Sequence, residues 1–215
     1  MKALIIGATG ATGTELTKQL LEQEEFTEVH VFVRNVPKIN HLKLNVHKVD
    51  FNEIITWSEK LKGDVLFLAM GTTLKTAGSK EAQYKVDVTY QFETAKAAAN
   101  NNVPKLILVS SVGANHKSIF FYPKIKGLSE EKVKKLNFKS IYILRPPVLD
   151  RGEDMMRDTE KKTITFIKRF NKIGLLLSQK PMTTLLLARK MILLASKETI
   201  HKKVTLEAKD IFRLE

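Results

Sequence analysis

The sequence predicts an α/β fold in which helices cover both faces of a doubly wound parallel sheet. Short runs of β-branched and apolar residues alternate along the chain with segments of helical length, as in βαβ units. Several runs, such as Leu106–Val109, are apolar at every position, as a strand must be when both of its faces are buried. No repeat or low-complexity linker divides the 215 residues, so we expect a single domain over residues 1–215.

The same alternation gives the boundaries of the expected elements. The apolar runs predict strands at Lys2–Ile6, Val29–Val33, Leu44–Val49, Val65–Ala69, Leu106–Ser110 and Ile141–Leu144. The intervening segments predict helices over residues 12–25, 53–61, 81–102, 125–136, 157–171 and 183–196. The third helix has a clear end, because three asparagines precede Pro104.

The composition is that of an ordinary globular protein, with 43% hydrophobic and 27% charged residues, which excludes wholesale disorder. Because the chain has no cysteine and its five histidines lack metal-ligand spacing, we expect neither disulfides nor a metal site. No apolar run reaches the roughly 18–20 residues that span a bilayer. The apolar start, Met1–Ile6, is too short for the core of a signal peptide. We therefore expect a cytoplasmic protein without a transmembrane segment.

The net charge of +13 lies entirely in the second half of the chain. Residues 1–100 carry 12 basic and 12 acidic side chains, and residues 101–215 carry 24 and 11. Nucleic acid is disfavoured as the partner, because no spaced aromatic platform for stacking bases accompanies the charge. The basic amphipathic stretch 157–172 is interpreted as a solvated helix, with contact to an anionic membrane or a nucleic-acid surface as the alternative. For the charge as a whole, an anionic substrate or a local cationic field around the site is favoured over nucleic acid.

A glycine-rich turn follows the first predicted strand and opens the first helix. Its three glycines, Gly7, Gly10 and Gly13, are three residues apart. They allow a tight turn, close approach of the backbone to a pyrophosphate, and close packing of helix on strand, while the phosphates bind the free N–H groups of the helix. This context predicts a Rossmann-type dinucleotide site. The residues expected to contact the cofactor here are Gly7, Thr9, Gly10, Ala11, Thr12 and Gly13.

The end of the second strand bears on the choice of dinucleotide. An NAD-specific site would place an acidic residue here to accept hydrogen bonds from the ribose hydroxyls. This chain has Arg34 instead, with Lys38 four residues further on. Because a guanidinium suits a 2′-phosphate, we expect NADP, with NAD as the alternative.

Tyr122 and Lys126 form a Tyr-x-x-x-Lys pair. The pair begins 11 residues after Ser111, where we expect the chain to pass from the fifth strand into a helix. Helical spacing puts both side chains on one face. Proton transfer near neutral pH requires a phenol whose pKa is below its free value of about 10, and a nearby ammonium would lower it. Since Pro123 restricts the residue before it, Tyr122 is expected at the helix entrance.

These motifs occur in order along almost the whole chain, together with Ser-Ser-x-Gly-Ala at 110–114 and Arg-Pro at 145–146. In this the sequence resembles the atypical and extended short-chain dehydrogenases/reductases, and among them the Tat-interacting-protein-like group, whose members bind NADPH. The resemblance implies catalytic roles for Ser111, Tyr122 and Lys126, with Lys126 also holding the nicotinamide ribose. Ser111 is preferred to Ser110, because in relatives the last serine before the turn faces the cofactor.

The resemblance also implies further cofactor contacts, which are Asp50 and Phe51 at the adenine, Gly71 and Thr72 at the ribose and phosphates, and the N–H of Val148 at the nicotinamide. Asp50 has an equal alternative as a helix N-cap. At Pro147 the chain departs from the family, which usually has glycine there, and one N–H donor is lost.

Two classes of function follow. The first is an NADP-dependent oxidoreductase that interconverts a carbonyl and an alcohol, or a related epimerase-like enzyme, with residues of about 146–215 covering a small substrate that is either neutral or anionic. The second is an NADPH-binding regulatory protein with little or no turnover. Monomer and homodimer are both compatible with the sequence.

Overall fold

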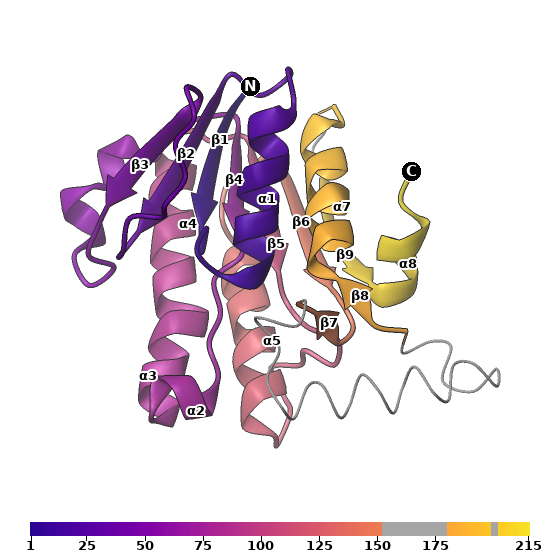
Figure 1. Cartoon of the computed structure of the whole chain (residues 1–215). Coiled ribbons are helices and arrows are strands. Elements are labelled where there is room, and N and C mark those ends of the chain that lie inside the picture. The colour runs from indigo at the N-terminus through magenta and orange to yellow at the C-terminus, as the bar shows by residue number, and fades with distance from the viewer. Residues whose placement is uncertain (152–179, 199–201) are drawn as a thin grey trace.

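The structure is a computed structural model that describes residues 1–151, 180–198 and 202–215 (Figure 1). Within these residues a seven-stranded sheet has the order β3-β2-β1-β4-β5-β6-β9, and every neighbouring pair runs parallel. Its strands are β1 (Lys2–Ile6), β2 (Glu28–Val33), β3 (Leu44–Lys48), β4 (Val65–Leu68), β5 (Lys105–Val109), β6 (Ser140–Arg145) and β9 (Lys202–Glu207). The predicted Rossmann-type doubly wound α/β fold is therefore confirmed.

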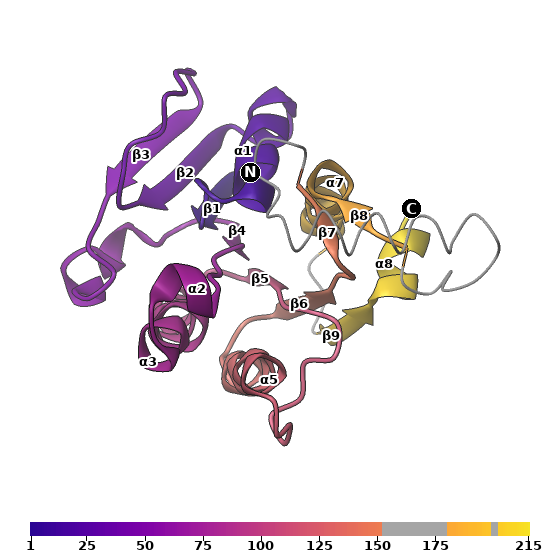
Figure 2. The same ribbon diagram turned by 60° about the horizontal axis from the view of Figure 1, so that its bottom comes forward.

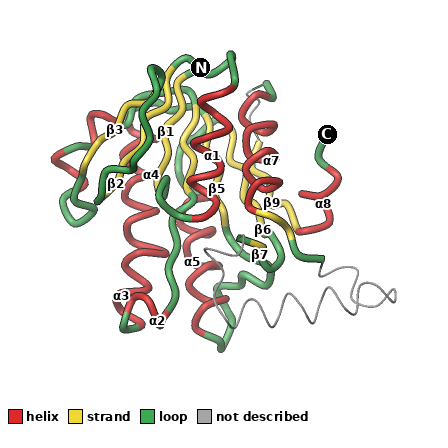
Figure 3. Tube along the Cα trace, in the orientation of Figure 1, coloured by secondary structure: helices red, strands yellow, loops and turns green. Residues whose placement is uncertain are grey.

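Helices cover both faces of the sheet, as Figures 2 and 3 show. On one face lie α1 (Ala11–Glu22) and α7 (Thr184–Ser196), and on the other lie α4 (Gln91–Asn100) and α5 (Phe121–Lys134). The side chains of β1 alternate between the two cores: Ala3 and Ile5 face α1 and α7, while Leu4 and Ile6 face the other layer. All four are fully buried, which explains why this strand has no polar residue after Lys2.

All six predicted strands are present, with ends that agree to within one residue. Three strands were not predicted. The edge strand β9 begins with two exposed lysines, and such charges hide a strand signal while protecting a sheet edge. The other two, β7 (Leu149–Asp150) and β8 (Met182–Thr183), are two-residue strands that pair with each other. Pairs this short leave no periodic pattern.

The helix predictions need more correction. The expected helix 53–61 is instead two 3₁₀ turns, η1 (Ile54–Thr56) and η2 (Ser58–Lys60), separated by the buried Trp57, whose indole N–H donates to the carbonyl of Asp50 at 2.9 Å. The expected helix 81–102 consists of α3 (Lys80–Tyr84), a π-helical segment η3 (Lys85–Tyr90) and α4, and two short helices, α2 (Leu74–Ala77) and α8 (Ala208–Arg213), were missed.

Three further helix predictions can be compared with the structure. The first helix ends at Glu22, three residues early, while α7 matches its prediction within one residue at its start and exactly at Ser196. Helix α5 starts at Phe121, four residues early, so that Tyr122 and Pro123 lie in its first turn as predicted. The predicted helix 157–171 lies outside the described residues.

The chain order places a crevice where the sheet reverses its direction of winding. From β1 the next strand along the chain, β2, lies on one side, and β4 lies on the other. Ligands of open α/β sheets bind at the carboxyl ends of the strands at such a switch point. The glycine turn after β1 and the loop after β4 meet there.

Candidate functional site

The glycine turn after β1 packs so tightly that two of its glycines are irreplaceable. Gly7 has a φ of +90°, and a Cβ on it would lie 2.6 Å from the backbone nitrogen of Met70. A Cβ on Gly13 would lie 2.0 Å from the carbonyl oxygen of Gly7. The N-cap of α1 is Gly10, whose lack of a side chain leaves the first N–H groups of the helix without a side-chain cap. The turn therefore presents a bare, electropositive helix N-terminus to the crevice.

Two adjoining cavities occupy the carboxyl edge of the sheet and share Gly10, Ala69, Met70, Gly71 and Thr72 as lining residues. The first, of about 480 Å³, extends toward β2 and β3, and we call it the adenine-side cavity. The predicted contacts that line it are Gly7, Thr9, Gly10, Arg34, Phe51, Gly71 and Thr72. Lys85 of η3 also lines it, and no aspartate or glutamate is among its described lining residues.

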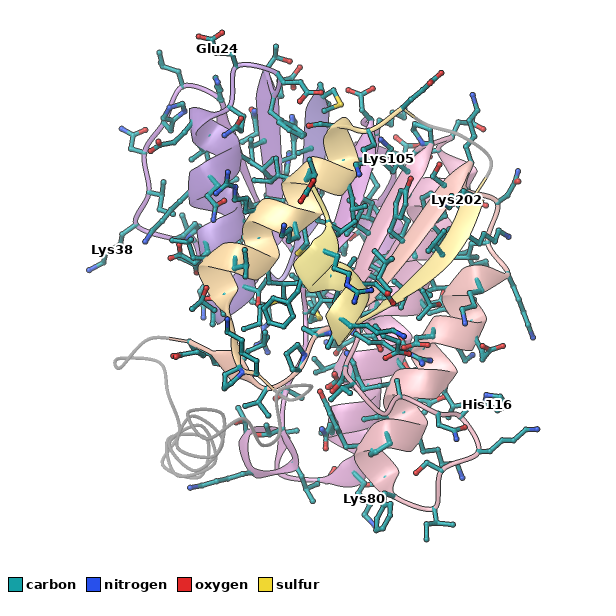
Figure 4. The ribbon with its side chains drawn as sticks, turned by 90° about the vertical axis from the view of Figure 1, so that its right-hand side faces the viewer. Glu24, Lys38, Lys80, Lys105, His116 and Lys202 are labelled. Carbon is teal, nitrogen blue, oxygen red and sulfur yellow. The ribbon has the colours of Figure 1, made fainter. Side chains whose placement is uncertain are left out.

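Two residues that the sequence placed near the adenine end are turned elsewhere. Lys38 is exposed and projects away from the fold in Figure 4. The carboxylate of Asp50 accepts hydrogen bonds from the backbone N–H and the side-chain amide of Asn52, both at 2.8 Å. Asp50 is also absent from the described lining of the adenine-side cavity. Its bonds to Asn52 close a local turn before η1, whose N-cap is Glu53, so Asp50 is not a helix N-cap either.

The second cavity, of about 540 Å³, lies beside β5 and α5, and we call it the tyrosine-side cavity. Its lining includes the predicted Gly10, Ala11, Thr12, Gly71, Thr72, Tyr122 and Lys126, together with Asp87 and Ser110. Four predicted site residues are missing from the described lining of both cavities, namely Gly13, Asp50, Ser111 and Val148. Gly13 is enclosed against Gly7, and the carbonyl of Val148 accepts the N–H of Met182 at 3.1 Å.

Helix α5 separates the environments of the two predicted catalytic side chains. Tyr122 is 42% exposed at the cavity mouth, while Lys126, one turn further on, is buried. The Lys126 ammonium donates to the carbonyl of Val109 at 3.2 Å and lies 3.5 Å from Oδ1 of Asp87. Lys126 is therefore held by β5 and η3 at the floor of the cavity.

Asp87 is a residue of the candidate site that the sequence did not predict. It is buried on η3, and its Oδ2 accepts the backbone N–H of Thr72 at 3.0 Å. Burial raises the pKa of Asp87, and the Lys126 ammonium and the Thr72 N–H oppose that rise. The only signal for Asp87 was an acidic residue within a predicted helix, and the π-helical turn that aims it at Lys126 leaves no sequence pattern.

The two adjacent serines are held differently. Ser110 lines the tyrosine-side cavity, and its hydroxyl donates to Oε1 of the buried Glu130 at 2.5 Å. Ser111 is half-buried, and its hydroxyl makes only a long contact of 3.3 Å with the carbonyl of Val112. The cavity wall is thus formed by the serine whose proton is already engaged.

In the described part of the chain, no group of three or more histidine, aspartate or glutamate side chains is arranged to hold a metal ion. Over the same residues, no helix is long and apolar enough to cross a membrane.

The fold and the glycine turn at the switch point define a Rossmann-type dinucleotide-binding protein. Residues 7–168 match the model of a family described as NAD(P)H-binding. Protein FMP52-1, mitochondrial, of Scheffersomyces stipitis is 37% identical over 164 residues, which cover 75% of this chain and 71% of that protein. FMP52, mitochondrial, of Saccharomyces cerevisiae is 34% identical over 68% of this chain and 64% of its own length. The chain belongs to this NAD(P)H-binding family and is similar to its FMP52 proteins.

Solved structures show the same fold at low sequence identity. The oxidoreductase YlbE from Lactococcus lactis superposes with a TM-score of 0.68 at 18% identity, covering 95% of this chain and 90% of that one. UDP-glucuronic acid 4-epimerase from Bacillus cereus, in complex with UDP-glucuronic acid and NAD, gives 0.68 at 17% identity over 95% and 77% of the two chains. The family model confirms the NAD(P)H binding that the resemblance to the atypical and extended dehydrogenases implies, and these structures confirm the fold.

The prediction of a cytoplasmic protein is wrong by the same comparisons, because the FMP52 relatives are named mitochondrial. That prediction rested on the absence of cysteine and of long apolar runs. Both features report on redox chemistry and membrane crossing, and neither reports on the compartment to which a chain is sent.

Proposed function

We propose that this protein is an NADP-dependent oxidoreductase that interconverts a small carbonyl compound and its alcohol through Tyr122, Lys126 and Ser111. The observation that carries the proposal is the pair of adjoining cavities. They run from a cationic, acid-free end at Arg34 and Lys85, across the glycine turn, to Tyr122 and Lys126. A dinucleotide laid along this path would place its phosphates on α1 and its nicotinamide beside the tyrosine.

The residues of the adenine-side cavity fit a nucleotide with a 2′-phosphate. Arg34 and Lys85 bring two cations to one wall, and the acidic residue that would select the free ribose hydroxyls of NAD is absent from the described lining. Phe51 and Tyr90, whose ring centroids are 5.7 Å apart, supply flat apolar surface for a base. These features favour NADP over NAD.

In the reducing direction, bound NADPH supplies the hydride. Tyr122 then gives its phenolic proton to the oxygen that becomes the alcohol, and the Lys126 ammonium stabilises the phenolate left behind. Val109 and Asp87 keep that ammonium on one face of α5. Ser111 lies two residues after β5 and outside the described lining of both cavities. Its hydroxyl has only a long contact within the described residues, so in this proposal it turns toward the bound substrate and donates to the substrate oxygen.

The pairing of Lys126 with Asp87 supports a second candidate function. Because Lys126 is already paired with a buried carboxylate, its support for a phenolate at Tyr122 is weakened, and this favours an NADPH-binding regulatory protein with slow chemistry. An epimerase-like reaction would use the same residues with a bound substrate that is oxidised and reduced in turn.

The first measurement is of nucleotide affinity. NADPH is titrated into the protein, and binding is monitored by the change in nicotinamide fluorescence. Turnover is then measured as NADPH oxidation with a panel of neutral and anionic carbonyl compounds. Tyr122→Phe should abolish turnover and leave NADPH affinity within about twofold, whereas Tyr84→Phe, outside both cavity linings, should change neither. Tight NADPH binding without Tyr122-dependent turnover would support the regulatory alternative. Absence of nucleotide binding would refute both.

A further inference from the structure

A buried charge network lies directly behind the tyrosine-side cavity and has no role in the chemistry described above. Glu130 of α5 is 1% exposed. Its Oε1 accepts the hydroxyl of Ser110 at 2.5 Å and Nε of Arg145 at 2.9 Å, and its Oε2 accepts Nη2 of Arg145 at 2.6 Å. Arg145 in turn donates from Nη1 to Glu207, at the end of β9, at 2.7 Å.

This network holds its carboxylate in a single orientation. The two parallel bonds from Arg145 form a bidentate pair, which has little freedom to rotate. The hydrogen bonds that Arg145 donates to Glu130 raise the pKa of Arg145 above its ordinary value, so the guanidinium keeps its charge throughout the pH range in which proteins fold. Since Arg145 and Glu207 end neighbouring strands, the sheet itself fixes the position of the carboxylate.

The fixed carboxylate of Glu130 determines which hydrogen-bonding groups of Ser110 remain available to a ligand. A serine hydroxyl has one proton to donate and two lone pairs that accept. Its proton points to Glu130, away from the cavity, so only the lone pairs remain for a group inside it. A hydrogen bond to an ionised carboxylate is roughly twice as strong as one between neutral groups, so a ligand carbonyl would not compete for the proton.

We propose that Glu130 is a positioning residue that makes Ser110 a hydrogen-bond acceptor toward the cavity. Ser110 then takes a hydroxyl or amide N–H of the bound substrate or cofactor, and it does not donate to the reacting carbonyl oxygen. That donation is left to Ser111 and Tyr122. The inference about the ligand rests on the proposed function, but the state of the Ser110 proton does not.

The absence of cysteine from the chain gives a clean test. In Ser110→Cys the thiol replaces the hydroxyl beside Glu130, and in the matched control Ser111→Cys the thiol lies one residue further on. The pH dependence of thiolate ultraviolet absorbance and of alkylation by iodoacetamide gives each thiol pKa. A carboxylate that accepts the thiol proton disfavours the thiolate, so we expect the Ser110→Cys thiol to titrate at least about one pH unit above Ser111→Cys, an about tenfold lower thiolate fraction.

Adding Glu130→Gln should lower the pKa of the Ser110→Cys thiol and leave that of Ser111→Cys unchanged. Equal titration of the two thiols in the presence of Glu130 would overturn the proposal, and this comparison needs no Glu130 variant to fold. A Ser110→Cys thiol that ignores Glu130→Gln in a folded protein would also overturn it.

A second readout concerns the ligand. With a carbonyl substrate from the panel and NADPH, Ser111→Ala should reduce kcat at least about tenfold, while Ser110→Ala should act on KM and leave kcat within about threefold. The reverse pattern would make Ser110 the donor and refute the proposal. If no substrate turns over, the proposed function fails, whereas the thiol titrations still decide the role of Glu130.

Discussion

The preference for NADP can be tested by removing each cation of the adenine-side cavity in turn. Arg34→Ala deletes the guanidinium at the end of β2, and Lys85→Ala deletes the ammonium on η3, the two cations that line this cavity beside Phe51 and Tyr90. Neither change touches the glycine turn, so the pyrophosphate subsite is retained in both variants. The quantity to compare is the ratio of NADPH to NADH affinity.

The expected size follows from exposure. Hydrogen bonds to charged groups contribute about 1.5–3 kcal/mol, and Arg34 is exposed, which places it at the lower end. Loss of about 1.5–2 kcal/mol corresponds to an about 10- to 30-fold weaker binding of NADPH, since 1.4 kcal/mol is tenfold. Lys85 is also exposed and carries a point charge, so its loss should cost about three- to fivefold. NADH binding should change less than about twofold in both.

The assay is titration of nicotinamide fluorescence with NADPH and NADH at two ionic strengths. Lys38→Ala is the matched control, because this exposed lysine projects away from the fold and is absent from the described lining (Figure 4). The ratio of NADPH affinity to NADH affinity should fall as the salt concentration rises, both in the unmodified protein and in Lys38→Ala. If Arg34→Ala weakens NADH as much as NADPH, or leaves both unchanged, then the cationic wall does not recognise a 2′-phosphate.

Two further predictions concern stability. Gly13→Ala should lower the free energy of unfolding in urea by about 3 kcal/mol or more, because its Cβ would lie 2.0 Å from a backbone oxygen, whereas Gly10→Ala, with 3.4 Å to its nearest atom, should cost less than half of that. His30 and His47, whose ring nitrogens are 2.8 Å apart, both have pKa values lowered by burial. Protonation then favours the unfolded chain, so stability should fall as pH drops below about 6.5, and His47→Gln should flatten that fall; an unchanged slope would contradict it.

The parts of the fold that the sequence predicts well are those with strong local patterns. Strands such as β1 and β5 are buried on both faces, so every residue after the first lysine of each strand is apolar and carries the signal. Strand β9 was not predicted because it lies at the sheet edge and begins with Lys202 and Lys203. The π-helical segment η3 was not predicted because its sequence continues the pattern of an α-helix. Its wider turn rotates the side chains that follow to a different face. Residues brought together by such a shift, as Asp87 and Lys126 are, share no spacing in the chain.

The site shows the same division. The glycine turn and the Tyr122–Lys126 pair could be located because each is local and its geometry follows from spacing. The hydrogen bonding of the two serines could not be predicted. It depends on Glu130 and on Arg145 at the end of β6, which lies 15 residues after Glu130 in the chain. Likewise, Lys85 of η3 and Arg34 after β2 line one cavity although they are far apart in the chain, and no local pattern predicts that pairing.

Helix α5 joins these separate observations. Tyr122, Lys126 and Glu130 follow one another at intervals of four residues, so one face of this helix carries all three. Each contacts a different environment: Tyr122 the open cavity mouth, Lys126 the carbonyl at the end of β5, and Glu130 the guanidinium at the end of β6. Two of the three are buried charges whose partners come from other elements, so the register of α5 against the sheet is coupled to the geometry of the site. A Cβ on Gly127 would lie 2.2 Å from the backbone nitrogen of His116, so the helix packs closely against the loop after β5 next to Lys126. A change that slides α5 should therefore displace the phenol, the ammonium and the Ser110 acceptor together, and mutations far from the cavity on this helix should impair all three functions at once.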